Sequence, residues 1–223
     1  MNFAICISGG GGFAKVVYKN AHLLGDHKMA LVICDRNSDG FRYFDKHTDI
    51  PTKLVLYDAY SSKDEAEKAI LCLLASYNID MVYLNYNRIL GKTLIDAYQS
   101  RIINLHLSLL PLFPGFGAIE KAYHSHMLFH GSTVHLVDES VDGGPIIGQV
   151  VIPKQPGETI EQFTQRHFEQ AAILFLDMIY KTLNVGIFWT DGRPYFKESE
   201  YGSSDFNPEL SLLRDQIQLN VFD

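Results

Sequence analysis

An asparagine and a histidine stand two residues apart in the short apolar run Arg101-Ile-Ile-Asn-Leu-His106. The run predicts a buried strand, on which residues two apart point to the same face. An asparagine amide can hold a developing oxyanion, and a histidine beside it can hydrogen-bond that oxygen or move a proton near neutral pH. Asn104 and His106 are therefore candidates for a catalytic pair.

A carboxylate that could complete this set lies in the turn Val141-Asp-Gly-Gly-Pro145. The glycines allow the backbone to approach a ligand closely, and Asp142 could orient His106, hold its charged form or relay a proton through water. Asp138 and Glu139 compete with Asp142 as the carboxylate. Spacing alone does not decide for catalysis, because an Asn-x-His at a strand end is more often structural.

Four further histidines crowd the same stretch of the chain. They are His124, His126, His130 and His135. The pair His124-x-His126 could suggest a metal site, but no set of His, Asp or Glu at a recognised zinc spacing surrounds it. The sequence therefore predicts no bound metal.

The elements that must position these residues alternate along the chain. Short apolar runs typical of buried parallel strands are separated by segments with helical periodicity. The predicted strands cover 3–8, 29–34, 80–84 and 101–106, and the predicted helices cover about 13–24, 62–77 and 92–98. This alternation predicts an α/β fold, an open, mostly parallel twisted sheet with helices on both faces, in which ligands bind at the carboxyl ends of strands.

The pattern changes in the C-terminal part. Residues 131–137 and 146–152 read as two strands close in sequence, which predicts an antiparallel excursion. A long helix is predicted over 158–183, and a short one from Asp205. No linker rich in Gly, Ser or Pro divides the chain, so we expect a catalytic domain over residues 1–190 and a C-terminal extension over 191–223 packed on it.

Composition limits the class of protein. The 223 residues are 47% hydrophobic and 20% charged, as in a globular protein with a real core. A net charge of −7 argues against a large nucleic-acid footprint, although backbone N–H groups can still bind an anion. The N-terminal apolar run is too short for a signal peptide or a membrane span, and the three scattered cysteines favour reduced thiols. We expect a cytoplasmic protein without a membrane partner.

Two longer stretches resemble the signature of the folate-dependent formyltransferases. They are Arg101-Ile-Ile-Asn-Leu-His-Leu-Ser-Leu-Leu-Pro-Leu-Phe-Pro-Gly115 and Gly131-Ser-Thr-Val-His-Leu-Val-Asp-Glu-Ser-Val-Asp-Gly-Gly-Pro-Ile-Ile-Gly-Gln149. The similarity runs from residue 1 to about Leu183, and the length is nearest to the branch that formylates glycinamide ribonucleotide in purine biosynthesis. The resemblance implies a Rossmann-like fold, 10-formyltetrahydrofolate as the formyl donor, and a small, phosphate-bearing primary amine as the acceptor.

The resemblance also implies roles for single residues. Attack of the amine on the formyl carbon gives a tetrahedral intermediate, whose oxygen Asn104 and His106 would stabilise. Asp142 would tune His106 and help to move the amine proton through water. Backbone groups would do most of the folate binding. The residues that match the folate-binding segments are Asn87, Arg88, Ile89, Leu90, Val137, Asp138 and Val141.

The acceptor side departs from the resemblance. Enzymes that act on glycinamide ribonucleotide have Gly-Ser-Asn after the first strand to bind the substrate phosphate, where this chain has Gly11, Gly12 and Phe13. The backbone N–H groups from Gly10 to Phe13 would still meet an anion, and a plain glycine turn is the alternative. Two other functions therefore stay open, N-formylation of an amino sugar nucleotide and hydrolysis of 10-formyltetrahydrofolate to formate. The oligomeric state is also open.

Overall fold

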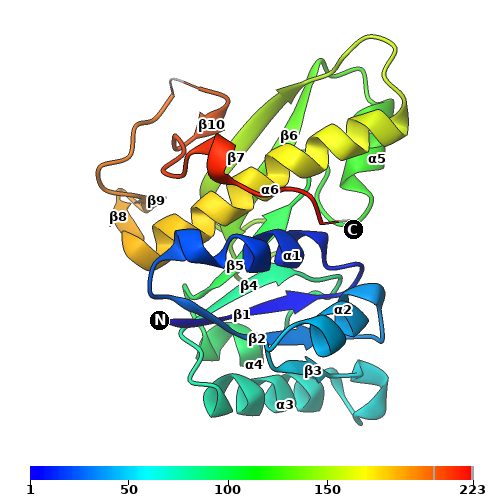
Figure 1. Ribbon diagram of the computed structural model, residues 1–223, viewed down its shortest axis with the longest axis vertical. Coiled ribbons are helices and arrows are strands. Elements are labelled where there is room, and N and C mark those ends of the chain that lie inside the picture. Colours follow the sequence, from blue (N-terminus) through cyan, green and yellow to red (C-terminus); the bar gives the residue numbers. More distant parts are fainter. Residues whose placement is uncertain (203, 222–223) are drawn as a thin grey trace. The chain divides into compact units, whose positions relative to one another are not determined.

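The chain folds into two compact units, which the computed structural model in Figure 1 describes for residues 1–202 and 204–221. Unit 1 comprises residues 1–104, 137–139 and 220–223, and unit 2 comprises residues 105–136 and 140–219. The division expected at residue 190 stays a prediction. Residues 203, 222 and 223 of the expected extension lie outside the described residues.

Unit 1 is built on a parallel sheet with the strand order β5-β4-β1-β2-β3. The strands are β1 (Asn2–Ile7), β2 (Lys28–Cys34), β3 (Thr52–Leu54), β4 (Met81–Asn85) and β5 (Ile102–His106), whose last two residues belong to unit 2. All four pairings are parallel. The carboxyl ends of these strands therefore lie along one edge of the sheet, which confirms the predicted mostly parallel α/β fold.

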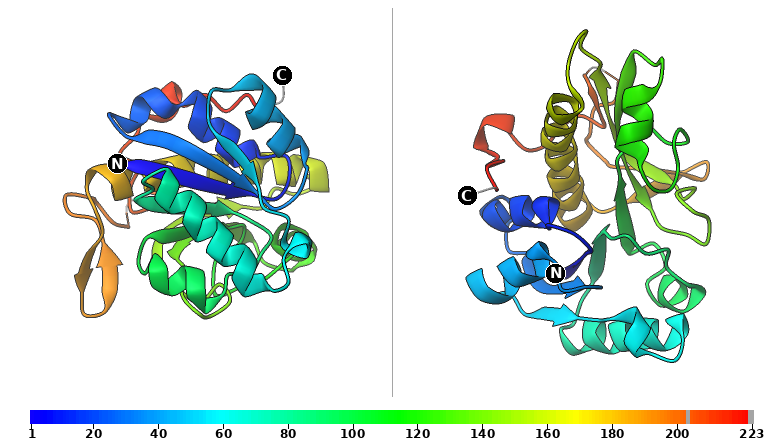
Figure 2. Two further views of the ribbon diagram at one scale, coloured as in Figure 1. Left: turned by 90° about the horizontal axis from the view of Figure 1, so that it is seen from below. Right: turned by 90° about the vertical axis from the view of Figure 1, so that its right-hand side faces the viewer.

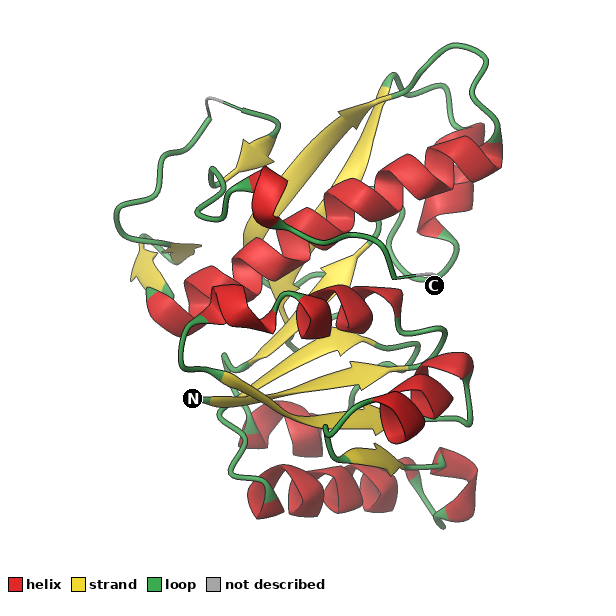
Figure 3. Cartoon of the chain, viewed as in Figure 1, coloured by secondary structure: helices red, strands yellow, loops and turns green. Residues whose placement is uncertain are grey.

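Helices connect these strands, as Figure 3 shows. They are α1 (Gly12–Lys19), α2 (Asp39–His47), α3 (Lys63–Ser76) and α4 (Lys92–Ala97), with 3-10 turns η1 (Ala21–Leu24) and η2 (Tyr57–Ala59). The single helix predicted over 13–24 was wrong, because α1 stops before Asn20. Both the main-chain N–H and the side-chain amide of Asn20 donate to the Val16 carbonyl, which ends the helix there.

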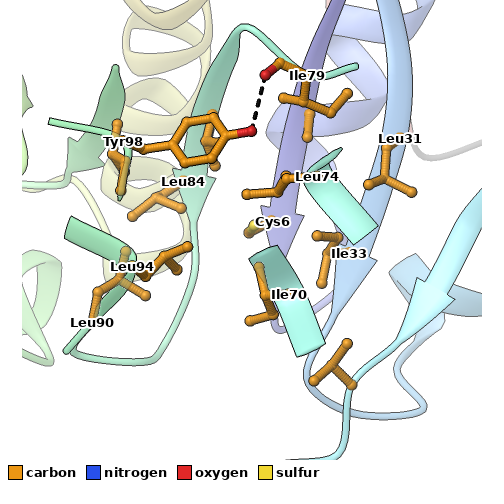
Figure 4. Close-up of a cluster of buried hydrophobic side chains, with 14 of the residues drawn as sticks. Cys6, Leu31, Ile33, Ile70, Leu74, Ile79, Leu84, Leu90, Leu94 and Tyr98 are labelled. Carbon is orange, nitrogen blue, oxygen red and sulfur yellow. Dashed lines mark hydrogen bonds between the residues drawn. The ribbon is translucent and has the colours of Figure 1, made fainter. Parts of the chain in front are cut away.

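The core of unit 1 lies on both faces of its sheet. Figure 4 shows side chains of α3 and α4 packed against one face, with the Tyr98 hydroxyl donating to the Ile79 carbonyl at 2.9 Å. On the other face, a Cβ added to Gly11 would meet Ile7 of β1 and Phe44 of α2. Gly11 also has a positive φ of 70°, so the glycine is required both for space and for backbone conformation.

Unit 2 is built on antiparallel strands (Figures 1 and 2). Its elements are α5 (Ala118–His124), β6 (Phe129–Leu136), β7 (Ile146–Pro153), α6 (Ile160–Asn184), β8 (Phe188–Thr190), β9 (Arg193–Tyr195), β10 (Phe206–Asn207) and the 3-10 turn η3 (Arg214–Gln216). The predicted antiparallel excursion is confirmed by the β6–β7 pairing. The short helix predicted from Asp205 was wrong, because the main chain there pairs with the edge of β7 as β10.

The long helix α6 packs on the strands of unit 2. It begins at a capping box in which Thr159 and Gln162 satisfy each other's main-chain N–H groups, close to the predicted start. A Cβ added to Gly148 of β7 would lie 2.5 Å from the sulfur of Met178, so helix and strand approach closely. Among the helices of the described residues, none combines the length and the apolarity that a bilayer span requires.

Candidate active site

The strand β5 carries the two residues with which the site begins. Its pairing with β4 extends to Asn104, and the strand ends at His106. The predicted strand is thus confirmed, and residues two apart on it share a face. His106 is 8% exposed and lies at the carboxyl end of the strand, where ligands bind in folds of this class.

The His106 ring lies between two hydrogen-bond acceptors of unit 2. Its Nε2 is 2.9 Å from the Phe113 carbonyl oxygen, and its Nδ1 is 3.3 Å from Oδ2 of Asp142. Both acceptors are satisfied only when both ring nitrogens carry hydrogen. Phe113 has a positive φ of 51°, which is unfavourable for a bulky residue. The loop therefore holds this carbonyl against His106 at a conformational cost.

The Asp142 carboxylate is surrounded by donors. Its Oδ2 accepts from the Gly115 N–H at 2.7 Å, and its Oδ1 lies 3.7 Å from Nε2 of His135. The neighbouring His135 ring outweighs burial and, with the Gly115 N–H and the nearby His106, lowers the pKa of Asp142 to about 2. The carboxylate is therefore ionised throughout the neutral range, which suits it to stabilise a protonated His106.

Sequence reasoning named His135 but gave it no role. Its ring is 3% exposed, and its Nδ1 lies 2.9 Å from the Leu136 carbonyl. Of the competing carboxylates, both in unit 1, Glu139 pairs with Lys92 at 2.5 Å and Asp138 is exposed. The structure brings together His106 and Asp142 and adds His135. No signal in the sequence set His135 apart from the neighbouring histidines.

The segment matched to folate binding, residues 87–90, lies between β4 and α4 in unit 1. Ile89 is 56% exposed, whereas Leu90 is 8% exposed and lies in the hydrophobic core of unit 1. In the described part of the chain, the main-chain N–H and C=O groups of residues 88–90 have no hydrogen-bond partner. These peptide groups are available to a planar polar ligand.

The second folate-matched segment divides between the two units. In unit 1, the Val137 N–H donates to the Ile102 carbonyl at 2.9 Å, and its side chain packs against the hydrophobic cluster of Figure 4. Asp138 is exposed. In unit 2, Val141 is 52% exposed and directly precedes Asp142. Val137 thus has a structural role, whereas Asp138 and Val141 present their side chains to solvent.

The glycine loop follows β1 in unit 1. A Cβ built on Gly10 would meet no heavy atom within 4 Å, so this loop is open on one side. The loop is fixed at its base, because the Gly40 N–H of α2 donates to the Gly9 carbonyl at 3.2 Å. Phe13 is 6% exposed and its side chain is part of the core. Main-chain groups are thus what this loop can present to a ligand.

The sequence is similar to a known family and to solved structures. The family model described as Formyl transferase matches residues 1–179. A phosphoribosylglycinamide formyltransferase of Bacillus subtilis is 36% identical over 166 residues, which is 74% of this chain and 85% of that protein. The enzyme of the same name from Haemophilus influenzae is 32% identical over 200 residues, 88% of this chain and 90% of that one.

Solved structures of proteins with the same names share the fold. The phosphoribosylglycinamide formyltransferase of Bacillus halodurans has a TM-score of 0.78 at 33% identity, covering 82% of this chain and 96% of that chain. The glycinamide ribonucleotide transformylase 1 of Symbiobacterium toebii has a TM-score of 0.82 at 27% identity, covering 88% and 93%. The likeness therefore extends over both compact units.

Proposed function

We propose, from the premise that this chain belongs to the formyl transferase family, that it transfers a formyl group from 10-formyltetrahydrofolate to the amino group of phosphoribosylglycinamide. That reaction is a step of purine biosynthesis. The observation that carries the proposal is the His106–Asp142 pair at the carboxyl end of β5, within the residues that the family match covers.

The transfer exchanges one bond for another. The amine nitrogen forms a bond to the formyl carbon, the bond from that carbon to the folate nitrogen breaks, and one proton leaves the amine while one reaches the folate nitrogen. Asn104 donates a hydrogen bond to the formyl oxygen as it becomes anionic, and His106 does the same when its Nε2–H exchanges the Phe113 carbonyl for this oxygen. Asp142, held ionised by its donors, orients His106 through Nδ1 and passes the amine proton on through water.

The unpaired peptide groups of residues 88–90 support folate as the donor. A pterin ring presents donors and acceptors along one edge, which peptide N–H and C=O groups can match. Asn87 and Arg88 are held at one end of this segment and Leu90 is anchored in the core at the other. Ile89, exposed beside these groups, gives the ring an apolar contact.

The glycine loop supports a phosphate-bearing acceptor. Gly10 and Gly11 precede α1 and Gly12 is its first residue, at a helix start where main-chain N–H groups and the helix dipole favour an anion. The loop has no serine hydroxyl or asparagine amide, and the Phe13 side chain is buried, so any phosphate contact there is made by the main chain. A small metabolite fits this mode of binding.

Residues 191–223 are proposed to be an extension that packs on the catalytic part. Within unit 2, β10 pairs with β7, and the main-chain N–H groups of Ser211 and Leu212 both donate to Asp177 of α6. These contacts support a stabilising role for the described part of the extension.

The function is tested by supplying the pure protein with 10-formyltetrahydrofolate and one amine at a time. Tetrahydrofolate release is expected with phosphoribosylglycinamide, and an Asn104→Ala variant is expected to lose about 10²–10³ in rate. A reaction with an amino sugar nucleotide and with no other amine would identify that nucleotide as the acceptor. Formate release without any amine would make the protein a hydrolase, and no turnover under any condition would refute the proposal.

A further inference from the structure

The segment 87–91 is held by side chains from three other elements of unit 1. The Asn87 N–H donates to the Ser8 hydroxyl at 2.8 Å, after the end of β1. The Arg88 Nε donates to Oδ2 of Asp35 at 2.7 Å, after the end of β2. Further along the segment, the Gly91 N–H donates to Glu67 of α3. Both ends are thus fixed, and the unpaired peptide groups lie between them.

Asp35 joins the contacts at the first end. Its side chain has no exposed surface, and it accepts from Arg36 at 2.8 Å as well as from Arg88. Burial alone would raise the pKa of Asp35, but hydrogen bonds from Arg36, Arg88 and the Ser8 hydroxyl outweigh it and lower the pKa. The Arg88 guanidinium also lies over the Tyr57 ring, 4.7 Å from its centre. The Arg88 side chain is therefore immobilised and not presented to a ligand.

Glu67 fixes the second end. Its side chain is 1% exposed, and its Oε1 accepts from the Gly91 N–H at 2.6 Å. The nearest cation, Lys63, is 3.8 Å away, so the main-chain N–H is the shorter contact. A Cβ added at Gly91 would lie 2.7 Å from Glu67 Oε2, so a larger residue there would displace the carboxylate from its present position. The carboxylate and the glycine are therefore matched to each other.

We propose that Asp35 and Glu67 are positioning residues of the folate site, which hold residues 88–90 in the conformation that presents their peptide groups to the ring. This inference rests on the proposed function. It differs from a purely structural role because each carboxylate contacts the segment itself rather than the sheet beneath it. Release of either end lets the three peptide groups turn away or pair with each other, so ligand affinity falls while the chemistry at His106 is unchanged.

The test compares steady-state constants of the full chain and its variants. Asp35→Ala and Glu67→Ala are each expected to raise KM for 10-formyltetrahydrofolate about tenfold, the effect of losing one hydrogen bond to a charged group, with kcat within about twofold. Glu67→Gln and Asp35→Asn keep one acceptor oxygen, so they are expected to restore most of the affinity. Direct titration with a non-reactive folate analogue should rank the wild type and the variants in the same order of affinity.

Glu65→Ala is the matched control on α3. The Glu65 carboxylate bonds Ser61 at the exposed start of that helix, so its loss weakens α3 without touching the segment. Its KM should equal that of the wild type. Equal KM values for wild type, Asp35→Ala and Glu67→Ala in folded proteins overturn the inference, as does an equal rise in Glu65→Ala. If Glu67→Ala does not fold, the comparison of Asp35→Ala with Asp35→Asn decides. An inactive wild type would refute the proposed function and not this inference. Binding of the folate analogue would then still test the positioning role.

Discussion

At the scale of single residues, the site depends on how charge is kept on a partly buried carboxylate. Asp142 is 14% exposed, and burial works against its charge. The groups around it, chiefly His135 and the Gly115 N–H, reverse that effect. The pairing of Asp142 with His106 therefore depends on these neighbours as well as on the pair itself.

Replacement of Asp142 by asparagine tests this dependence. Asp142→Asn keeps the shape but removes the charge beside His106, so kcat is expected to fall about 10²–10³-fold. The folded-state pKa of Asp142, about 2, lies below its ordinary 3.8, so its contribution of about 2 kcal/mol exists above pH 4 and is lost as pH falls toward 2. Urea unfolding at pH 7 and stopped-flow transfer assays measure both effects. Unchanged kcat would show that the ionised carboxylate is dispensable.

The sequence anticipated part of this site. Asn104 and His106 were singled out because strand periodicity fixes their common face, and Asp142 because its glycine turn lets the backbone approach a ligand closely. The donors to Asp142 were not found. Gly115 contributes through a main-chain N–H, which leaves no trace in residue type, and His135 was one histidine among several.

At the scale of elements, α6 and β6 meet through two buried histidines. Nδ1 of His130 and Nδ1 of His167 are 3.0 Å apart, and the Ser132 hydroxyl lies 2.7 Å from Nε2 of His167. The Phe163 ring stacks on His130. Burial, reinforced by the charge of Arg166, lowers the pKa of His130 to about 4, and burial with the neighbouring His130 lowers that of His167 to about 3. This contact between helix and strand therefore requires neutral rings.

Mild acid is accordingly expected to weaken the protein. Above the ordinary pKa of 6.5 both rings are neutral in either state, and below it only the unfolded chain takes up protons. Each histidine then lowers the free energy of unfolding by about 1.4 kcal/mol per pH unit until its folded-state pKa is reached. Urea unfolding at pH 7, 6 and 5 measures how the free energy of unfolding changes with pH. This change should be smaller for His167→Gln, whose amide can still bond Ser132, than for the wild type. An equal pH dependence in the two proteins would exclude the buried histidines as its origin.

Elements were easier to predict where pattern and capping agreed. The helix predicted over 62–77 is confirmed, and the Ser62 hydroxyl caps it by accepting from the Glu65 N–H. The Glu65 carboxylate in turn accepts from the Ser61 hydroxyl. The pairs β8–β9 and β10–β7 were not predicted, because strands of two or three residues carry no measurable alternation.

At the scale of the whole chain, the C-terminal tail closes a buried ion pair in unit 2. Asp177 is completely buried and Lys181 is 1% exposed, with their charged atoms 3.4 Å apart. Burial raises the pKa of Asp177, although Lys181 and two tail N–H groups oppose the shift. Lys181 also donates to the Ser211 hydroxyl at 2.5 Å. The tail thus supplies three of the hydrogen bonds that make burial of these charges tolerable.

A chain that ends at Tyr201 should therefore lose more stability than the newly exposed surface under the tail accounts for. Both charges stay buried on α6 without their tail partners, at an expected cost of about 3–5 kcal/mol in the free energy of unfolding. In that shortened chain, Asp177→Leu with Lys181→Met should recover much of the loss, because no charge is then left without partners. Urea unfolding of the four proteins, with and without tail and pair, measures this coupling. If the cost of removing the tail and the cost of replacing the ion pair prove additive, the tail is not needed for the buried pair.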